Sequence, residues 1–423
     1  MDKPINYIAL AIPVFFLLIG IELLYQKFTK KKLYRLNDSV ANISTGVVQQ
    51  TLAILVKGLL LIAYIWLYDH TRIFEFSRKN PWAWVLLFIG VDFFYYWFHR
   101  YAHEISIMWG GHIVHHQSEE YNLSVALRQG AFQAFFSWVF YLPLAVFGFD
   151  WVMFVVVNQF QTLYQFWIHT RAIDKMPRWF EFIFNTPSHH RVHHGINPKY
   201  IDKNHGGTFI IWDRLFGSFQ PEEEEVVYGI TKPLNSWNPV WANIDYFRDI
   251  FLAAWKSKSW KNKLYIFLKG PGWMPPDLGG PQIPKEVEPQ TFKKFEIEIP
   301  KGLNYYALFQ FVILLLASSV FLLFQEKIES SFVQPWNVIV NLGIGVSIFF
   351  SVMVIGGIFE KKIWARNFEF FRFPLIAILL FFILEGSQLQ WILPGIIFVL
   401  MFFSLLWLKR FNFVFQHKKF QND

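Results

Sequence analysis

The 423-residue sequence contains no cysteine. This absence excludes disulfide bonds, thiolate metal ligands and cysteine nucleophiles, and it leaves the redox compartment unspecified. Charged residues are also scarce, at 17% against about 25% in an average soluble domain. Because 54% of the residues are hydrophobic, 20% are aromatic and the mean hydropathy is +0.29, the composition indicates a membrane protein.

Long apolar runs predict an all-α, polytopic membrane protein. A helix needs about 20 apolar residues to cross about 30 Å of hydrocarbon. Nine candidate spans are present, near residues 6–25, 46–68, 81–98, 131–148, 151–168, 304–324, 335–357, 373–386 and 390–408. The pair at 131–168 is interrupted at Gly148, Phe149 and Asp150, so it is interpreted either as two crossings or as a hairpin that only dips into the membrane.

Basic residues predict the topology, because Lys and Arg concentrate in short cytoplasmic loops. The three richest clusters are Lys27, Lys30, Lys31, Lys32 and Arg35, then Lys361, Lys362, Arg366 and Arg372, then Lys409, Arg410, Lys418 and Lys419. With nine crossings and the N-terminus outside, all three clusters fall on the cytoplasmic face. The net charge of +8 indicates contact with anionic lipid headgroups, and nothing in the sequence points to nucleic acid.

The same layout predicts three regions. Residues 1–98 are expected to form transmembrane helices, and residues 302–423 to form the C-terminal ones. Between them, residues 99–301 are expected to be a catalytic region with an inserted helical hairpin (131–168). The tryptophans of this region with lysines nearby predict an interfacial segment at Trp237, Trp241, Trp255 and Trp260.

Eleven of the thirteen histidines lie between Asp92 and Phe219, and their spacing predicts a metal site. They are His99, His103, His112, His115, His116, His169, His189, His190, His193, His194 and His205. Residues three or four apart share one face of a helix, so the pair at 99 and 103 and each of the two HxxHH groups are expected to point at a common target.

So many imidazoles exceed the four ligands of one tetrahedral metal. They predict two metal ions, or one ion with a large surrounding shell of histidines. Imidazole binds zinc, copper, iron and nickel, so the spacing alone leaves the metal open.

Three other polar residues are candidates for catalysis. Asp92 lies two turns before His99 on one face of the same predicted helix, and we expect it either to orient a histidine or to form an interhelical hydrogen bond. Glu104 is a metal ligand, a proton shuttle or a solvated helix end. Asn122 is a lining residue of the active site or an ordinary helix cap.

The strings HRYAHE, HIVHHQSEEYNLSVALRQ, LYQFWIHT, NTPSHHRVHHGIN and IIWDRLFGSF resemble the fatty acid hydroxylase and sterol desaturase superfamily of membrane di-iron enzymes, and most of all its ether-lipid-cleaving members. The resemblance is closest over residues 92–219. It implies that two irons are held by His99, His103, His112, His115, His116, His190, His193 and His194, with His169 as a further ligand or as a donor beside one.

The resemblance also implies roles for the remaining polar residues. Glu104 and Asn122 match positions on which the family relies for activity. His189 is implied to be a ligand or a donor beside one. His205 departs from the pattern, since NHGG replaces the NYGG that the resemblance leads us to expect, and it either replaces a tyrosine structurally or adds a ligand. His70 and His417 lie outside the motifs.

The implied activity is an O2-dependent hydroxylation of the ether-linked carbon of alkylglycerol lipids, giving a fatty aldehyde and a glycerol derivative. The resemblance implies tetrahydrobiopterin as reductant. No pterin fingerprint and no fused cytochrome or flavin segment is readable, so the electron donor is expected to be external. Two alternatives remain open: another lipid hydroxylase or desaturase acting on fatty acyl or sterol-like substrates, and a membrane metal transporter, which would hold its histidines inside facing spans.

Overall fold

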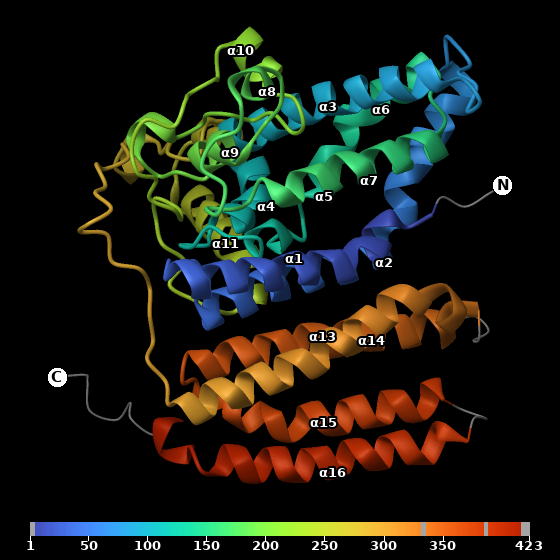
Figure 1. Cartoon of the computed structure of the whole chain (residues 1–423), viewed down its shortest axis with the longest axis vertical. Coiled ribbons are helices and arrows are strands. Elements are labelled where there is room, and N and C mark those ends of the chain that lie inside the picture. Colours follow the sequence, from blue (N-terminus) through green and yellow to red (C-terminus); the bar gives the residue numbers. More distant parts are fainter. Residues whose placement is uncertain (1–4, 331–335, 385–387, 416–423) are drawn as a thin grey trace. The chain divides into compact units, whose positions relative to one another are not determined.

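The computed structural model describes residues 5–330, 336–384 and 388–415. Within these residues the protein is all-helical, and only two isolated bridges, Phe184–Phe209 and Gly195–Tyr228, pair extended backbone (Figure 1). The all-α prediction is confirmed. His417, Lys418 and Lys419 lie outside the described residues.

The chain divides into two compact units. The first, unit 1, comprises Met1–Arg35, Val56–Leu234 and Asn243–Lys294, and unit 2 comprises Leu36–Leu55, Asn235–Ala242 and Phe295–Asp423. The long helix α2 (Leu36–Thr71) contributes to both units. The other helices that fall mainly in unit 1 are α1 (Tyr7–Thr29), α3 (Pro81–Glu104), α4 (Ser106–His116), α5 (Ala134–Ser137), α6 (Leu142–Phe147), α7 (Trp151–Trp167), α8 (Arg178–Ile183), α9 (Pro187–His193), α10 (Ile211–Phe216), α11 (Pro239–Lys256) and α12 (Trp260–Leu268).

Five helices among the described residues are long and apolar enough to cross a membrane. They are α1, α3, the Lys301–Leu323 part of α13 (Lys301–Ser330), the Val338–Phe359 part of α14 (Trp336–Phe359), and α16 (Leu389–Lys409), and each coincides with a predicted span. The predicted span at 46–68 lies within α2, where the side chains of residues 54–60 fall outside the described residues. The span at 373–386 falls in α15 (Ile363–Ile383) and runs past the last residue described there.

The predicted crossing at 131–148 is wrong. That segment forms only short helical pieces, α5, a 3-10 turn at Trp138–Tyr141 and α6, which together span Ala134–Phe147 and are too short to cross. Helix α7 follows after a sharp turn and has 17 residues. Neither segment is among the span-length helices, and the hairpin at 131–168 stays a prediction.

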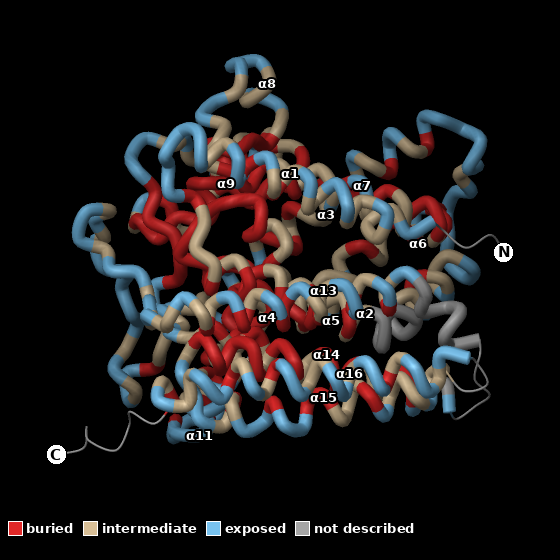
Figure 2. Tube along the Cα trace, turned by 60° about the horizontal axis from the view of Figure 1, so that its bottom comes forward, coloured by how far each residue is buried: buried red, intermediate tan, exposed pale blue. Residues whose placement is uncertain are grey.

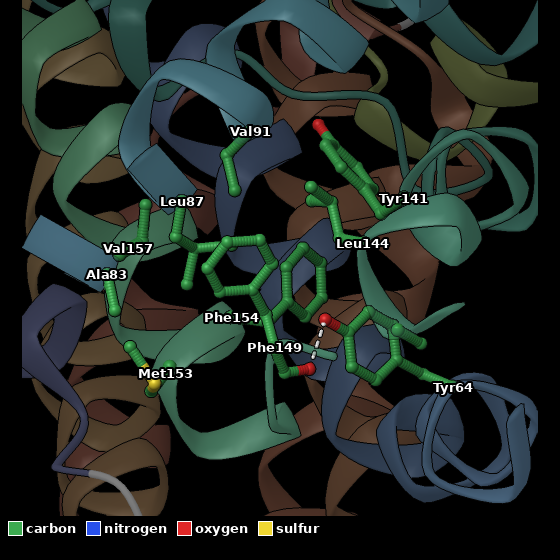
Figure 3. Close-up of a cluster of buried hydrophobic side chains, with 11 residues drawn as sticks. Tyr64, Ala83, Leu87, Val91, Tyr141, Leu144, Phe149, Met153, Phe154 and Val157 are labelled. Carbon is green, nitrogen blue, oxygen red and sulfur yellow. Dashed lines mark hydrogen bonds between the residues drawn. The ribbon is translucent and has the colours of Figure 1, made fainter. Parts of the chain in front are cut away.

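A core of buried aromatic and aliphatic side chains holds this hairpin against α3 (Figure 3). Leu87 and Val91 of α3 pack with Leu144 of α6 and Met153 of α7, all nearly inaccessible to solvent. The Tyr64 hydroxyl donates to the Phe149 carbonyl at 2.9 Å. Because this packing fixes α7 along α3, it also fixes the C-terminal ends of the two helices beside each other.

Those C-terminal ends lead to the histidines. His99 and His103 lie in the last two turns of α3, and His169 follows α7 by two residues. Helix α1 contributes Glu22, whose buried carboxylate accepts hydrogen bonds from the Tyr34 hydroxyl, the Leu123 N–H and the Thr170 hydroxyl. The chain around α4 and α9 is accordingly among the most buried of unit 1 (Figure 2).

Unit 2 is built on four helices, α13 (Lys301–Ser330), α14 (Trp336–Phe359), α15 and α16, which pack in sequence order, with α13 also contacting α16. Buried polar groups connect three of them. Arg372 of α15 forms an ion pair with Glu369 at 2.6 Å and donates to Gln310 of α13 at 2.5 Å, and Gln310 donates to Ser404 of α16 at 3.0 Å. The two buried charges of this pair thus have partners, as burial requires.

Gly148 is required at the turn between α6 and α7. Its φ is +107°, and an added Cβ would lie 1.9 Å from the Phe74 carbonyl oxygen. Gly217 has a similar φ of +77° but no heavy atom within 4 Å of an added Cβ. We expect Gly217→Ala to destabilise the protein by about 1 kcal/mol through backbone strain alone, and Gly148→Ala by more than about 3 kcal/mol because the clash adds to the strain.

Thermal unfolding of the two purified variants in one detergent measures this difference. Equal midpoints would show that the α6–α7 turn does not have the close approach described here.

Candidate metal centre

Nine buried histidines form two groups, and within each group the candidate ligand nitrogens lie within 4.8 Å of one another. The first group is His99, His103, His112, His116 and His193, and the second is His115, His169, His190 and His194. These are the nine residues that the sequence singled out as ligands.

Helical phase decides which histidine belongs to which group. His112 and His116, four residues apart on α4, face the first group, whereas His115 faces the second. The other HxxHH motif is reversed, since His190 and His194 face the second group and His193 the first. The expectation that each motif points all three rings at one target is therefore wrong: a rotation of about 100° per residue sends the middle ring elsewhere.

Backbone carbonyls fix the orientation of several rings. The Nδ1 atoms of His99, His115, His169 and His193 lie 2.7–3.0 Å from the carbonyl oxygens of His205, Arg128, Gln165 and Lys203. A carbonyl only accepts hydrogen bonds, so each of these Nδ1 atoms is the protonated donor. The Nε2 atom of each neutral ring then carries a lone pair, as a metal ligand requires.

The opposite nitrogens converge without a proton to share. The Nε2 atoms of His115 and His169 lie 3.2 Å apart, although both rings already donate through Nδ1. Two lone pairs at this distance repel unless a cation lies between them. In the first group the Nε2 atoms of His103 and His193 are buried and lack a hydrogen-bond partner in the described chain. The donor set of both groups therefore fits metal ions.

Burial keeps these rings neutral. Removal from water lowers the pKa of His112 and that of His169 to about 4, and it lowers the pKa of His194 well below the ordinary value. Metal binding requires unprotonated imidazole, and the rings of both groups hold that form at neutral pH.

Asp92 does not touch a histidine in the described part of the chain. Its carboxylate accepts from the backbone N–H groups of Thr208 at 2.6 Å and Phe209 at 3.0 Å, and from the Trp212 indole at 2.9 Å. These bonds anchor the loop whose His205 carbonyl orients His99. Asp92 is thus connected to a ring through one loop.

Glu104 ends α3 and has a partly exposed side chain that pairs with Arg100 at 2.8 Å. It belongs to neither histidine group, so its position does not support the ligand alternative. Asn122 is fully buried. Its amide donates to the Leu33 carbonyl at 2.8 Å, and its side-chain oxygen accepts from the Ser124 backbone N–H at 3.0 Å, which is the geometry of a local cap.

Two further histidines lie outside both groups. The His205 ring lies 5.1 Å from the His103 ring, and its Nδ1 is buried without a hydrogen-bond partner among the described residues. His189 faces Phe219 and contacts the Thr186 hydroxyl at 3.3 Å.

Sequence reasoning missed two side chains that support the rings. The Gln133 side-chain oxygen accepts a hydrogen bond from His112 Nδ1 at 2.8 Å, and an Asp202 carboxylate oxygen lies 3.4 Å from His103 Nδ1. No spacing pattern in the sequence connects Gln133 to the histidines. Asp202 lies just before the NHGG string, and that position is a signal from which it could have been predicted.

Comparisons with known proteins cover the segment that carries the nine histidines. The family model described as "Fatty acid hydroxylase" matches residues 84–218, which contain all nine histidines. An alkylglycerol monooxygenase of Xenopus tropicalis is 40% identical over 381 residues, covering 89% of this chain and 82% of that protein. The chain belongs to the alkylglycerol monooxygenase family.

Other alkylglycerol monooxygenases show the same extent of similarity. The protein of Danio rerio is 37% identical and covers 95% of this chain and 87% of its own length, and that of Homo sapiens is 42% identical and covers 74% and 71%. No solved structure matches the chain. The family predicted from the histidine strings is thereby confirmed.

The division into two groups predicts the result of removing one ligand. His115→Ala takes one of four nitrogens from the second group, so we expect the metal content to fall from two ions per chain to about one, and turnover to fall by more than about 100-fold. Elemental analysis of the purified protein measures the metal content.

His189→Asn is the matched control, because it changes a buried histidine next to His190 that belongs to neither group. It should retain both ions. Two ions in His115→Ala, or loss of an ion in His189→Asn, would show that the groups are assigned wrongly.

Proposed function

We propose that this membrane monooxygenase hydroxylates the ether-linked carbon of alkylglycerol lipids and thereby releases a fatty aldehyde and a glycerol derivative. The observation that carries the proposal is the pair of buried imidazole groups with unprotonated Nε2 atoms, in a chain that aligns with alkylglycerol monooxygenases over most of its length.

We infer that the two groups hold two iron ions. Five imidazoles would hold one ion and four the other. The bound irons would supply the reduction of O2 and the oxidation of a C–H bond. Two electrons are needed from an external donor, for which we propose tetrahydrobiopterin.

The overall reaction balances without a further reagent. The alkyl ether, O2, two electrons and two protons give water and a hemiacetal with the new hydroxyl on the ether-linked carbon. The C–O bond to glycerol then breaks, so the aldehyde keeps the new oxygen and glycerol keeps the ether oxygen.

The residues of this chain orient the histidine rings and exclude water from the metal centre. The carbonyls of Arg128 and Gln165 hold His115 and His169 in one tautomer. The Trp109 ring lies 4.8 Å from that of His103, and the Tyr121 ring lies 5.7 Å from that of His169, so aromatic surface borders both groups. An apolar wall excludes water, which protects a reactive oxidant from side reactions.

We propose that Asp92 and Asn122 act as positioning residues. Asp92 would act through the loop at Thr208, and Asn122 would act by fixing the segment after α4 to Leu33. For Glu104 we propose proton delivery from solvent toward the centre, because it is partly exposed and stands directly after a ligand.

We place the site on the cytoplasmic face. The basic residues Lys30, Lys31 and Lys32 directly follow α1, and the backbone carbonyls of Lys32 and Leu33 accept hydrogen bonds from Arg171, two residues beyond His169. The positive cluster and the second histidine group thus lie at one end of unit 1, and basic loops are typical of the cytoplasmic side.

An assay for aldehyde tests the proposed reaction. The iron-loaded protein in lipid is given an alkylglycerol, tetrahydrobiopterin and ¹⁸O₂, and the aldehyde is reduced at once to the alcohol to prevent exchange with water. We expect one ¹⁸O in the alcohol and none in glycerol, with no product from His115→Ala.

Other outcomes distinguish the alternatives. Hydroxylation or desaturation of an acyl or sterol-like lipid, with no aldehyde from the ether, would favour another lipid oxidase of the superfamily. Zinc content with no oxygen consumption on any lipid would favour metal transport, although the ligands here lie on a helix end, two short helices and a loop rather than in facing spans.

Proton delivery predicts the behaviour of Glu104→Gln. The side chain is outside both metal groups, so this variant should keep two metals and its unfolding temperature while kcat falls, on the order of 100-fold. Glu75→Gln, which removes a carboxylate from another exposed arginine pair, is the control and should retain the wild-type kcat. A wild-type kcat for Glu104→Gln would identify Glu104 as a solvated helix end.

A further inference from the structure

Helices α11 and α12 form a pair whose inner face packs directly on α4. Ile250 and Ala254 of α11 join Ile266 of α12 in a buried cluster with Ile107 at its edge. The backbone N–H of Ser106 donates to the Lys269 carbonyl at 2.9 Å, and the hydroxyls of Ser106 and Tyr246 are 2.9 Å apart. Because α4 carries three of the nine histidines, this pair is the outer support of the metal centre.

The contact between these elements is tight. A Cβ added at Gly110, two residues before His112 on α4, would lie 2.6 Å from the Phe247 ring. The N–H of Ala131 donates to the Asn243 side chain at 2.7 Å, which ties the start of the pair to the segment after Gln129. Movement of the pair would therefore move α4.

The outer face of the pair is apolar and uncovered. Trp255 and Trp260 are each 83% exposed, and five further large apolar side chains on the two helices are more than 40% exposed: Ile244, Phe251, Leu252, Leu264 and Leu268. On α12 the exposed residues at 260, 264 and 268 follow the four-residue spacing of one helix face. We refer to these seven exposed side chains as the stripe, and exposed apolar side chains gathered in this way are typical of a surface that meets protein or membrane.

The charges around this stripe favour an anionic membrane as its partner. Residues 250–276 contain five lysines, Lys256, Lys258, Lys261, Lys263 and Lys269, and no acidic residue. The acids of α11, Asp245 and Asp249, come earlier, and Asp249 already pairs with Lys232 and Arg248. Asp277 directly follows this segment, and its carboxylate accepts hydrogen bonds from the Ser257 hydroxyl at 3.3 Å and the Lys258 backbone N–H at 3.2 Å, so the five lysines still outnumber the acid beside them. Aromatic and aliphatic side chains flanked by lysines are typical of a helix that lies in the headgroup layer of an anionic membrane.

We propose that the outer face of α11 and α12 docks on an anionic phospholipid surface, with Trp255 and Trp260 inserted among the headgroups and the lysines paired with lipid phosphate and carboxylate groups. The docked pair holds α4 at a fixed depth, so the metal centre stands next to the layer from which a lipid substrate arrives. The docking itself does not depend on the proposed reaction.

The absence of cysteine allows a direct test on the full chain. Phe251→Cys and Leu264→Cys each provide a single site for an environment-sensitive fluorophore on the stripe, and Glu223→Cys provides a control on the exposed acidic run. The labelled proteins are placed in phosphatidylcholine nanodiscs with or without phosphatidylserine. Quenching by nitroxide-bearing phospholipid and by aqueous iodide is then compared, and metal content verifies that each variant is folded.

We expect the labels at 251 and 264 to be quenched by the lipid nitroxide and several-fold less by iodide than the label at 223. Phosphatidylserine should strengthen the lipid quenching, and high salt or the triple change of Lys256, Lys258 and Lys261 to Gln should remove that gain.

Three results would overturn the proposal. Iodide quenching at 251 and 264 equal to that at 223 would place the stripe in water. Protection from both quenchers would mean that protein covers it. Equal lipid quenching with and without phosphatidylserine would reject the anionic surface.

Discussion

The structure depends on the repulsion between the lone pairs of neighbouring, unprotonated histidine Nε2 atoms, which a bound cation relieves. Backbone carbonyl oxygens accept hydrogen bonds from the Nδ1–H groups of rings such as His115 and His169, and the unprotonated Nε2 atoms of these two rings then face each other at 3.2 Å. In a buried, weakly screening environment this repulsion is strong. A metal ion bound in each histidine group would relieve this repulsion, and we propose that metal binding contributes to the folding of the elements that carry the rings.

This constraint explains the layout of unit 1. The ligands lie at the end of α3, on α4, at His169 just after α7, and on α9 and the residue that follows it. These segments are distant in the sequence. The hydrophobic packing of α3, α6 and α7 fixes the first and third of these, and buried polar contacts from Glu22 and Asp92 fix the loops between them. Gly207 shows how little room remains, since an added Cβ would meet the Gln161 side chain at 2.1 Å and the Asp92 carboxylate at 2.8 Å.

Much of this was readable in the sequence, and the limits have physical causes. Histidine spacing identified eight of the nine rings that the fold brings together, the family resemblance added His169, and the apolar runs identified five span-length helices. Spacing did not predict that the middle ring of each HxxHH motif joins a different group from the other two rings. The orientation of each helix relative to its neighbours decides which ring faces which group. Nor did spacing reveal Gln133, whose contact with His112 arises from tertiary packing alone. Asp92 was recognised as exceptional, but its partners, the N–H groups of Thr208 and Phe209, lie more than a hundred residues away and leave no local signal.

X-ray absorption spectroscopy of the iron-loaded protein tests the central claim most directly, because it counts the atoms bound to the metal. Nine imidazoles shared between two ions predict an average of between four and five nitrogen neighbours per iron, with the multiple-scattering signature of imidazole. These neighbours should lie at about 2.0–2.2 Å, the usual range for imidazole nitrogen on a first-row metal. A shell made mainly of oxygen, or binding of a single ion per chain, would contradict the account.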